Sequence, residues 1–96
     1  MSAFNTRVEL HGVQHDSDKY TRLHERMAAR GFSRRIKAND GRVFELPPAE
    51  YHWDGTATND QIRDLAKAAA AEVVTSYAVL VTKSAGCVWS GLKQVA

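Results

Sequence analysis

The sequence predicts one small α+β domain whose elements follow in the order β-α-β-β-α-β. Apolar residues recur at every second position in some segments, as in half-buried strands, and at every third or fourth position in two others, as in amphipathic helices. The chain has 96 residues, of which 44% are hydrophobic and 25% are charged. That length supports one modest core, so we expect residues 1–96 to form a single domain.

The first strand and the first helix are expected within residues 4–31. Alternation over residues 4–10 predicts a strand whose buried face carries Phe4, Thr6, Val8 and Leu10. A helix is expected to begin at Asp16 or Ser17, because either side chain can cap free backbone N–H groups. The residues expected on its apolar stripe are Tyr20, Leu23, Met27 and Ala28. Gly31 suits the left-handed position past the helix end.

A hairpin is expected after this helix, with its turn at residues 39–41. A three-residue loop with its glycine in the left-handed conformation pairs Ile36 with Phe44 and Arg35 with Glu45. This register sets apolar beside apolar and opposite charges beside each other. A two-residue loop does neither, so we expect the three-residue loop.

The returning segment has two interpretations because Pro47 and Pro48 cannot donate hydrogen bonds to a ladder. In the first, residues 42–53 form one extended, edge-like stretch broken at the prolines. In the second, residues 51–53 form the third strand of the sheet and residues 42–46 extend a hairpin.

The second half predicts a helix and a strand. Thr58 and Gln61 fit a capping box at the start of a helix that continues to about Val73. Residues 77–82 are continuously apolar, which is typical of a central strand. Residues 88–92 are expected to form a short added strand or a packing tail. The resulting order is the ferredoxin-like arrangement, an antiparallel sheet with two helices on one face and a short C-terminal extension.

The remaining composition limits the classes of protein. No apolar run exceeds five residues, so no transmembrane span and no membrane partner is expected, and no signal peptide is visible. Cys87 is a lone cysteine, which favours a reducing, cytoplasmic location. His11 and His15 have a spacing seen in zinc sites, but Gly12 disfavours the helix that this spacing needs. We therefore predict no metal and no cofactor.

The charge is distributed unevenly along the chain. Residues 1–42 carry nine Lys or Arg and five Asp or Glu, a net charge of +4, whereas residues 43–96 carry four and six, a net charge of −2. Planar guanidinium groups suit phosphodiesters, so this asymmetry predicts an RNA-binding face. The side chains expected to hold phosphate are Arg22, Arg26, Arg34 and Arg35. His24, beside them, is the expected acid or base of RNA cleavage, with Arg22 as its catalytic partner.

Three short segments resemble one known family. These are Phe4-Asn5-Thr6, Gly31-Phe32-Ser33, and Leu46-Pro47 followed by Glu50-Tyr51. They are similar to the antitoxins of type V toxin–antitoxin systems (GhoS-type endoribonuclease antitoxins). The resemblance covers residues 4–82 and implies a ferredoxin-like fold and cleavage of the messenger for a small membrane toxin. The family's basic first helix matches Arg22, whereas His24 stands where another basic residue is expected.

These observations lead to two functional hypotheses. The first is an endoribonuclease antitoxin that acts on single-stranded RNA and stacks bases on Tyr51 or Trp53 where these are exposed. The alternative is a non-catalytic ferredoxin-like module that binds RNA or protein, or forms a homodimer through its open sheet face.

Overall fold

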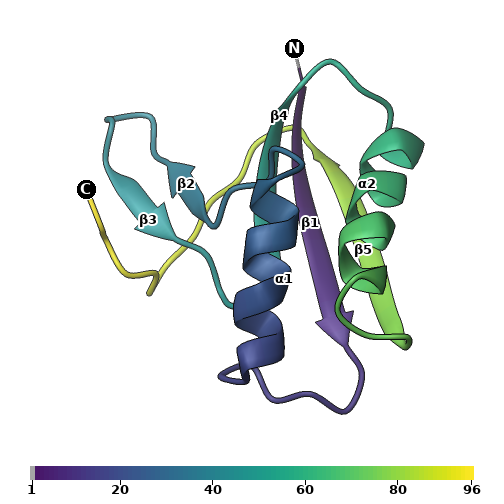
Figure 1. The fold of residues 1–96 in the computed structure, drawn as a ribbon. Coiled ribbons are helices and arrows are strands. Elements are labelled where there is room, and N and C mark those ends of the chain that lie inside the picture. Colours follow the sequence, from purple (N-terminus) through teal and green to yellow (C-terminus); the bar gives the residue numbers. More distant parts are fainter. Residues whose placement is uncertain (1) are drawn as a thin grey trace.

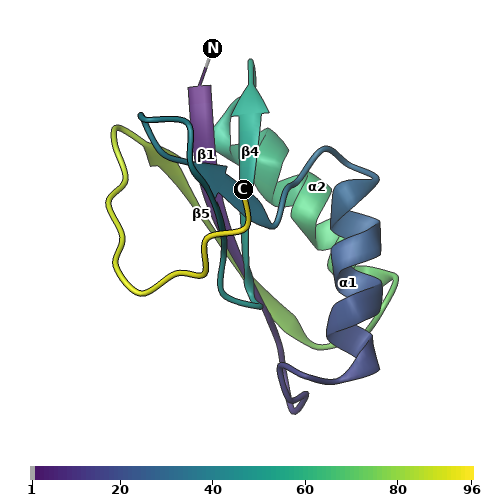
Figure 2. The same cartoon turned by 90° about the vertical axis from the view of Figure 1, so that its left-hand side faces the viewer.

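The computed structural model describes residues 2–96 and shows an α+β fold, the class expected from the sequence (Figure 1). Its elements are β1 (Ser2–Leu10), α1 (Asp18–Ala28), β2 (Arg35–Lys37), β3 (Val43–Glu45), β4 (Glu50–Gly55), α2 (Asn59–Ala71) and β5 (Tyr77–Ser84). The strands form a three-stranded antiparallel sheet in the order β4-β1-β5 and a separate two-stranded sheet of β2 and β3. Both helices cover the same face of the larger sheet (Figure 2).

The core lies between that sheet and the two helices. β1 is the central strand, and the four residues predicted for its buried face are all buried. On α1, Tyr20, Leu23 and Met27 are buried as predicted, whereas Ala28 is exposed. α2 contributes Ile62 and three alanines, whose small side chains allow the helix to lie close to the sheet. The face of the larger sheet opposite the helices is called the open face below.

Thr6 is a polar residue inside this core. It is 1% exposed, and its hydroxyl oxygen has no hydrogen-bond partner among the described residues. A Thr6→Val substitution keeps the side-chain shape and removes the unpaired hydroxyl, so we expect the free energy of unfolding to rise by about 1 kcal/mol. The melting temperature should rise by roughly 4–8 °C. Thr82→Val, at an exposed site, is the control; a lower melting temperature for Thr6→Val contradicts the expectation.

The helix ends confirm the expected local signals. Ser17 caps α1 by accepting a hydrogen bond from the backbone N–H of Lys19, at 3.2 Å. Gly31 has a φ of +90°, the left-handed conformation expected past the helix end. Thr58 and Gln61 form the predicted capping box, with both reciprocal hydrogen bonds present. These contacts fix the starts of both helices over the sheet.

The hairpin, defined as residues 35–45, has the predicted register. Ile36 lies opposite Phe44 and Arg35 opposite Glu45, with Gly41 at a φ of +91° in the turn. The hairpin is separate from the larger sheet. The segment just before it is bridged to β4, where Ser33 and His52 exchange two backbone hydrogen bonds of 2.8 Å each.

The chain between β3 and β4 decides between the two interpretations of residues 42–53. A single extended stretch is wrong, because β3 and β4 belong to different sheets. The chain turns at the prolines, and the backbone N–H of Glu50 donates to the Pro47 carbonyl at 2.9 Å. The second interpretation is therefore correct, with residues 51–53 inside a strand of the larger sheet.

β5 is an edge strand, so the prediction of a central strand at residues 77–82 is wrong. Its side chains alternate between half-buried positions under α2 and exposed positions on the open face. Leu80, on the open face, is 65% exposed. The continuous apolar run therefore does not reflect burial on both faces of the sheet.

The tail, defined as residues 85–96, leaves β5 and returns to the hairpin (yellow in Figure 1). Backbone hydrogen bonds join Lys93 to Glu45 at 2.9 Å, and both Val95 and Ala96 to Val43 at 2.8 Å. The tail thus adds to β3 through residues 93–96 rather than through 88–92. Over the described part of the chain, neither helix has the length and apolar character to cross a membrane.

Candidate functional site

His24 is a half-buried residue of α1 whose side chain contacts β4. Its Nδ1 atom lies 2.6 Å from the Tyr51 hydroxyl. Burial, together with the nearby positive charge of Arg34, lowers the pKa of His24 to about 4. Burial also raises the pKa of Tyr51, so the phenol stays protonated and forms a hydrogen bond with the neutral imidazole. His24 is therefore not a proton donor for catalysis at neutral pH.

His24 links stability to pH. Its pKa in the unfolded chain is near 6.5 and in the folded chain about 4, so the unfolded chain binds protons first as the pH falls. Stability is complete above the unfolded value and is lost between pH 6.5 and pH 4. Because the ring is partly exposed, we expect a loss of about 1 kcal/mol at pH 5.

Urea unfolding at pH 7.5 and pH 5 measures this linkage. His24→Gln should reduce the difference between the two pH values, whereas the exposed-site control His11→Gln should keep it. An unchanged pH dependence in His24→Gln contradicts the assignment.

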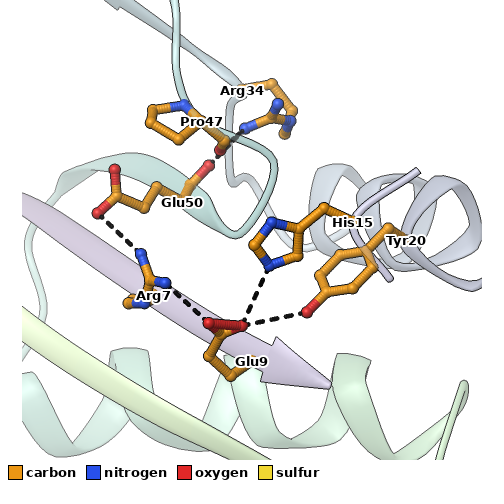
Figure 3. Close-up of polar contacts among 7 residues, drawn as sticks. All are labelled: Arg7, Glu9, His15, Tyr20, Arg34, Pro47 and Glu50. Atoms are coloured by element: carbon orange, nitrogen blue, oxygen red, sulfur yellow. Dashed lines mark hydrogen bonds and ion pairs between the residues drawn. The ribbon is translucent and has the colours of Figure 1, made fainter. Parts of the chain in front are cut away.

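Arg34 is held against β4 as part of the fold. Its side chain is 20% exposed, and one guanidinium nitrogen donates to the carbonyl oxygens of Pro47 and, at 2.8 Å, Glu50 (Figure 3). The guanidinium carbon lies 5.6 Å from the centre of the Tyr51 ring. Arg34 thus closes the turn at the prolines, which leaves few of its donors for phosphate.

The arginines of α1 lie away from His24. Arg22 and Arg26 are each two residues from it, which places them about 200° around the helix. Arg22 is exposed, and no ion pair involves Arg22 or Arg26 among the described residues. Arg30 pairs with Glu72 on the α2 side at 2.9 Å. The structure does not bring His24 and these arginines into one site.

Arg35 lies instead in a groove of about 750 Å³ between the hairpin, the tail and the open face at β4. Two more cationic residues, Lys37 and Arg42, line the same groove. Arg42 is paired with Asp40 at 2.8 Å, whereas no ion pair involves Arg35 or Lys37 in residues 2–96. Arg35 nevertheless lies opposite Glu45, and Arg35 and Lys37 both project from the face of the hairpin opposite to that of Ile36 and Phe44.

Aromatic side chains form a second part of this groove. Phe44 from β3 and Trp89 from the tail meet edge to face, with ring centres 5.4 Å apart. Of the two residues expected to stack bases where they are exposed, Tyr51 is buried and Trp53 is half-buried. Tyr51 is 1% exposed, and Trp53 packs on Phe4 and donates its indole N–H to the carbonyl of Arg30 at 3.2 Å.

His52 faces the same groove from the open face of β4. Its side chain is 17% exposed. Its Nε2 atom lies 3.0 Å from an Asp54 carboxylate oxygen, and its Nδ1 atom lies 3.3 Å from the side-chain oxygen of Asn5, its partner on β1. An imidazole held on both sides in this way has a fixed orientation toward anything bound in the groove.

The other end of the open face neutralises its own charges (Figure 3). Arg7 on β1 contacts Glu9 at 2.7 Å and Glu50 at 3.6 Å. His15 and the Tyr20 hydroxyl also reach Glu9, at 3.4 and 3.3 Å. The hydrogen bond from Arg7 is the main cause that lowers the pKa of Glu9. This end therefore presents paired charges, unlike the groove.

The sequence analysis found Arg35 but missed His52, Lys37, Arg42 and Trp89 as groove residues. Lys37 and Arg42 belong to the basic segment already noted, and the alternation around Tyr51 places His52 on the opposite face. Trp89 has no sequence signal, because only the return of the tail to β3 brings it to the hairpin. Comparisons with protein-family models, curated proteins and solved structures find no match for this chain.

Proposed function

We propose that the chain binds single-stranded RNA in the groove between the hairpin and the tail. The observation that carries this proposal is that one groove is lined both by the cationic residues Arg35, Lys37 and Arg42 and by the aromatic pair of Phe44 and Trp89, with the Arg42 guanidinium over the Phe44 ring. Cations that follow a backbone and aromatic rings that stack on bases are the two components of single-strand recognition.

The charges favour a nucleic acid over a neutral ligand. Arg35 and Lys37 alternate with buried Ile36 on β2, so both project from the same face of the strand. Arg42 adds a guanidinium above the Phe44 ring, at 5.6 Å from its centre. The hairpin therefore carries cations on both faces, with Arg42 on the face of the aromatic pair, where a phosphodiester backbone beside stacked bases meets it.

The size of the groove favours a single strand. Its volume of about 750 Å³ is within the usual range of small-ligand sites, and residues 87–92 of the tail form part of its lining. A groove of this volume fits small groups such as single bases, and unpaired bases, unlike bases stacked within a duplex, are free to stack on Trp89. We therefore infer that a short unpaired segment is the ligand, in the reducing cytoplasm that the lone Cys87 favours.

A ferredoxin-like scaffold is the fold that we propose for this binding module. The sheet order β4-β1-β5, with both helices on one face, supplies three strands of that arrangement. The isolated bridge between Ser33 and His52 supports the proposal that the segment before β2 serves as a fourth strand beside β4. This reading accords with the resemblance to type V antitoxins, and the short hairpin β2–β3 is then an extension of the fourth strand.

RNA cleavage in the same groove is the second candidate, and the geometry of His52 favours it. In this reaction His52 Nδ1 gives up its 3.3 Å contact with Asn5 and accepts the proton of a 2′-hydroxyl, whose oxygen bonds to the adjacent phosphorus. The 5′-oxygen leaves and takes a proton from water, which yields a 2′,3′-cyclic phosphate and a 5′-hydroxyl. Asp54 orients the imidazole at 3.0 Å. His52→Ala should abolish cleavage with little loss of binding; cleavage that persists excludes this role.

Fluorescence anisotropy with a labelled single-stranded RNA of mixed sequence tests the binding proposal. We expect affinity to fall as salt rises, with a slope of log affinity against log salt of about 0.7 for each phosphate contact. An Arg35→Ala/Lys37→Ala double variant should lower that slope by about 0.7 for each residue. Duplex RNA and single-stranded DNA are the comparison ligands.

Arg22→Ala/Arg26→Ala is the matched control, since it removes two positive charges from α1, away from the groove. This variant should bind almost as tightly as the unmodified chain. If only the α1 variant binds RNA more weakly, the binding site lies on α1 and the proposal of binding in the groove is wrong.

A further inference from the structure

The outer edge of β5 is an unpaired strand edge. β5 pairs with β1 through eight residues on one side. On its other side, no β-bridge or backbone hydrogen bond involves residues 77–84 within the described chain. A row of main-chain N–H and C=O groups is thus available to another strand.

The two edges of the larger sheet differ. At the β4 edge, Ser33 exchanges two backbone hydrogen bonds with His52, and the chain then continues into the hairpin. The β5 edge has no comparable cover. The larger sheet therefore has one open edge.

The sequence of β5 lacks the features that usually protect a strand edge. It contains no proline, and its only charged residue is Lys83, near the end of the strand. Leu80, at its middle, is 65% exposed on the open face. Such a strand favours pairing with a complementary strand over remaining in water.

We propose that this edge pairs with the same edge of a second copy of the chain, antiparallel and centred on Leu80. In this register Leu80 meets the Leu80 of the second copy on the open face, and Ala78 meets Thr82. On the helix face, Val79 meets Val81 and Tyr77 meets Lys83. No pair sets like charges together, so the strand is complementary to itself in this register.

The single open edge determines the size of the assembly. An antiparallel pair of identical strands is a two-fold symmetric contact, in which each copy uses the same residues. Once two copies pair, the combined sheet ends at two β4 edges, which Ser33 bridges in each copy. The contact therefore closes as a dimer and does not extend into a fibre. This inference does not depend on RNA binding.

Sedimentation equilibrium of the full chain tests the dimer. We expect twice the 10.6 kDa mass of one chain, with dissociation on dilution. Leu80→Lys sets two ammonium groups opposite each other at an exposed site, so it should yield a folded monomer by circular dichroism. Val88→Lys, at a residue that is 96% exposed on the tail, should remain dimeric. A monomeric unmodified chain, or a Leu80→Lys variant as dimeric as Val88→Lys, overturns the proposal.

Disulfide cross-linking tests the register, with Cys87→Ser as the background. Directly opposed residues have Cβ atoms about 4.5–5.5 Å apart, so Leu80→Cys should cross-link two copies on mild oxidation. Ala78→Cys is four positions from the same residue of the second copy, roughly 14 Å along the strand, and should not cross-link. Cross-linking at residue 78 but not at residue 80 overturns the register.

Discussion

Arg34→Ala should lower the free energy of unfolding by about 2–4 kcal/mol, because it removes a charged donor from two backbone carbonyl groups. Those carbonyls belong to Pro47 and Glu50, at the turn that separates β3 from β4. The substitution also removes the guanidinium that lies against the ring of Tyr51. Urea unfolding at pH 7 measures the change.

Arg35→Ala is the matched control for stability, since it is the neighbouring arginine and is exposed. It should change the unfolding free energy by less than about 0.5 kcal/mol. Arg34→Lys should recover little, because an ammonium group cannot reproduce the planar fork of donors. If Arg34→Ala is as stable as Arg35→Ala, the structural role of Arg34 is wrong and a phosphate role becomes the better explanation.

Trp89→Ala should weaken binding of single-stranded RNA by roughly 5- to 150-fold, which corresponds to the loss of about 1–3 kcal/mol of stacking on one base. Trp89 contacts Phe44 in the groove and is half-buried, so one part of its ring system is accessible. Anisotropy titrations at constant salt compare the variants.

Trp89→Phe keeps an aromatic surface and should retain most of the affinity. Val88→Ala, beside it on the tail, controls for changes in the tail itself. If Trp89→Ala and Val88→Ala bind RNA with equal affinity, the tail does not contribute to RNA binding through Trp89.

Local signals of the fold could be read from the sequence because each depends on neighbouring residues. The hairpin register followed from which side chains a three-residue loop sets opposite each other, and Ile36 does lie opposite Phe44. The capping box at Thr58 and Gln61 followed from a spacing of three residues. Such features need no knowledge of the rest of the chain.

The predictions that were wrong concern residues whose environment depends on distant parts of the chain. The apolar run of β5 is typical of a central strand, but whether a strand has one neighbour or two depends on where the hairpin goes. The hairpin leaves the larger sheet after Ser33, and the tail returns to β3. Neither path is encoded in a local pattern.

The candidate site was predictable in part. The concentration of positive charge before residue 43 pointed correctly to a cationic region, and Arg35 lines the groove. The predicted role of His24 in proton transfer required an exposed imidazole. In the fold, burial against β4 and the nearby charge of Arg34 instead lower the pKa of His24 to about 4. Trp89 becomes part of the groove only through the returning tail.

The two tryptophans allow one direct test of the groove. Trp53 is packed in the fold, with its indole N–H bonded to the carbonyl of Arg30, whereas Trp89 lines the groove. We therefore expect a ¹⁵N-labelled chain titrated with single-stranded RNA to show a large shift of the Trp89 indole signal and little change at Trp53. Amide shifts confined to Arg22 and Arg26 on α1, with Trp89 unchanged, would contradict binding in the groove.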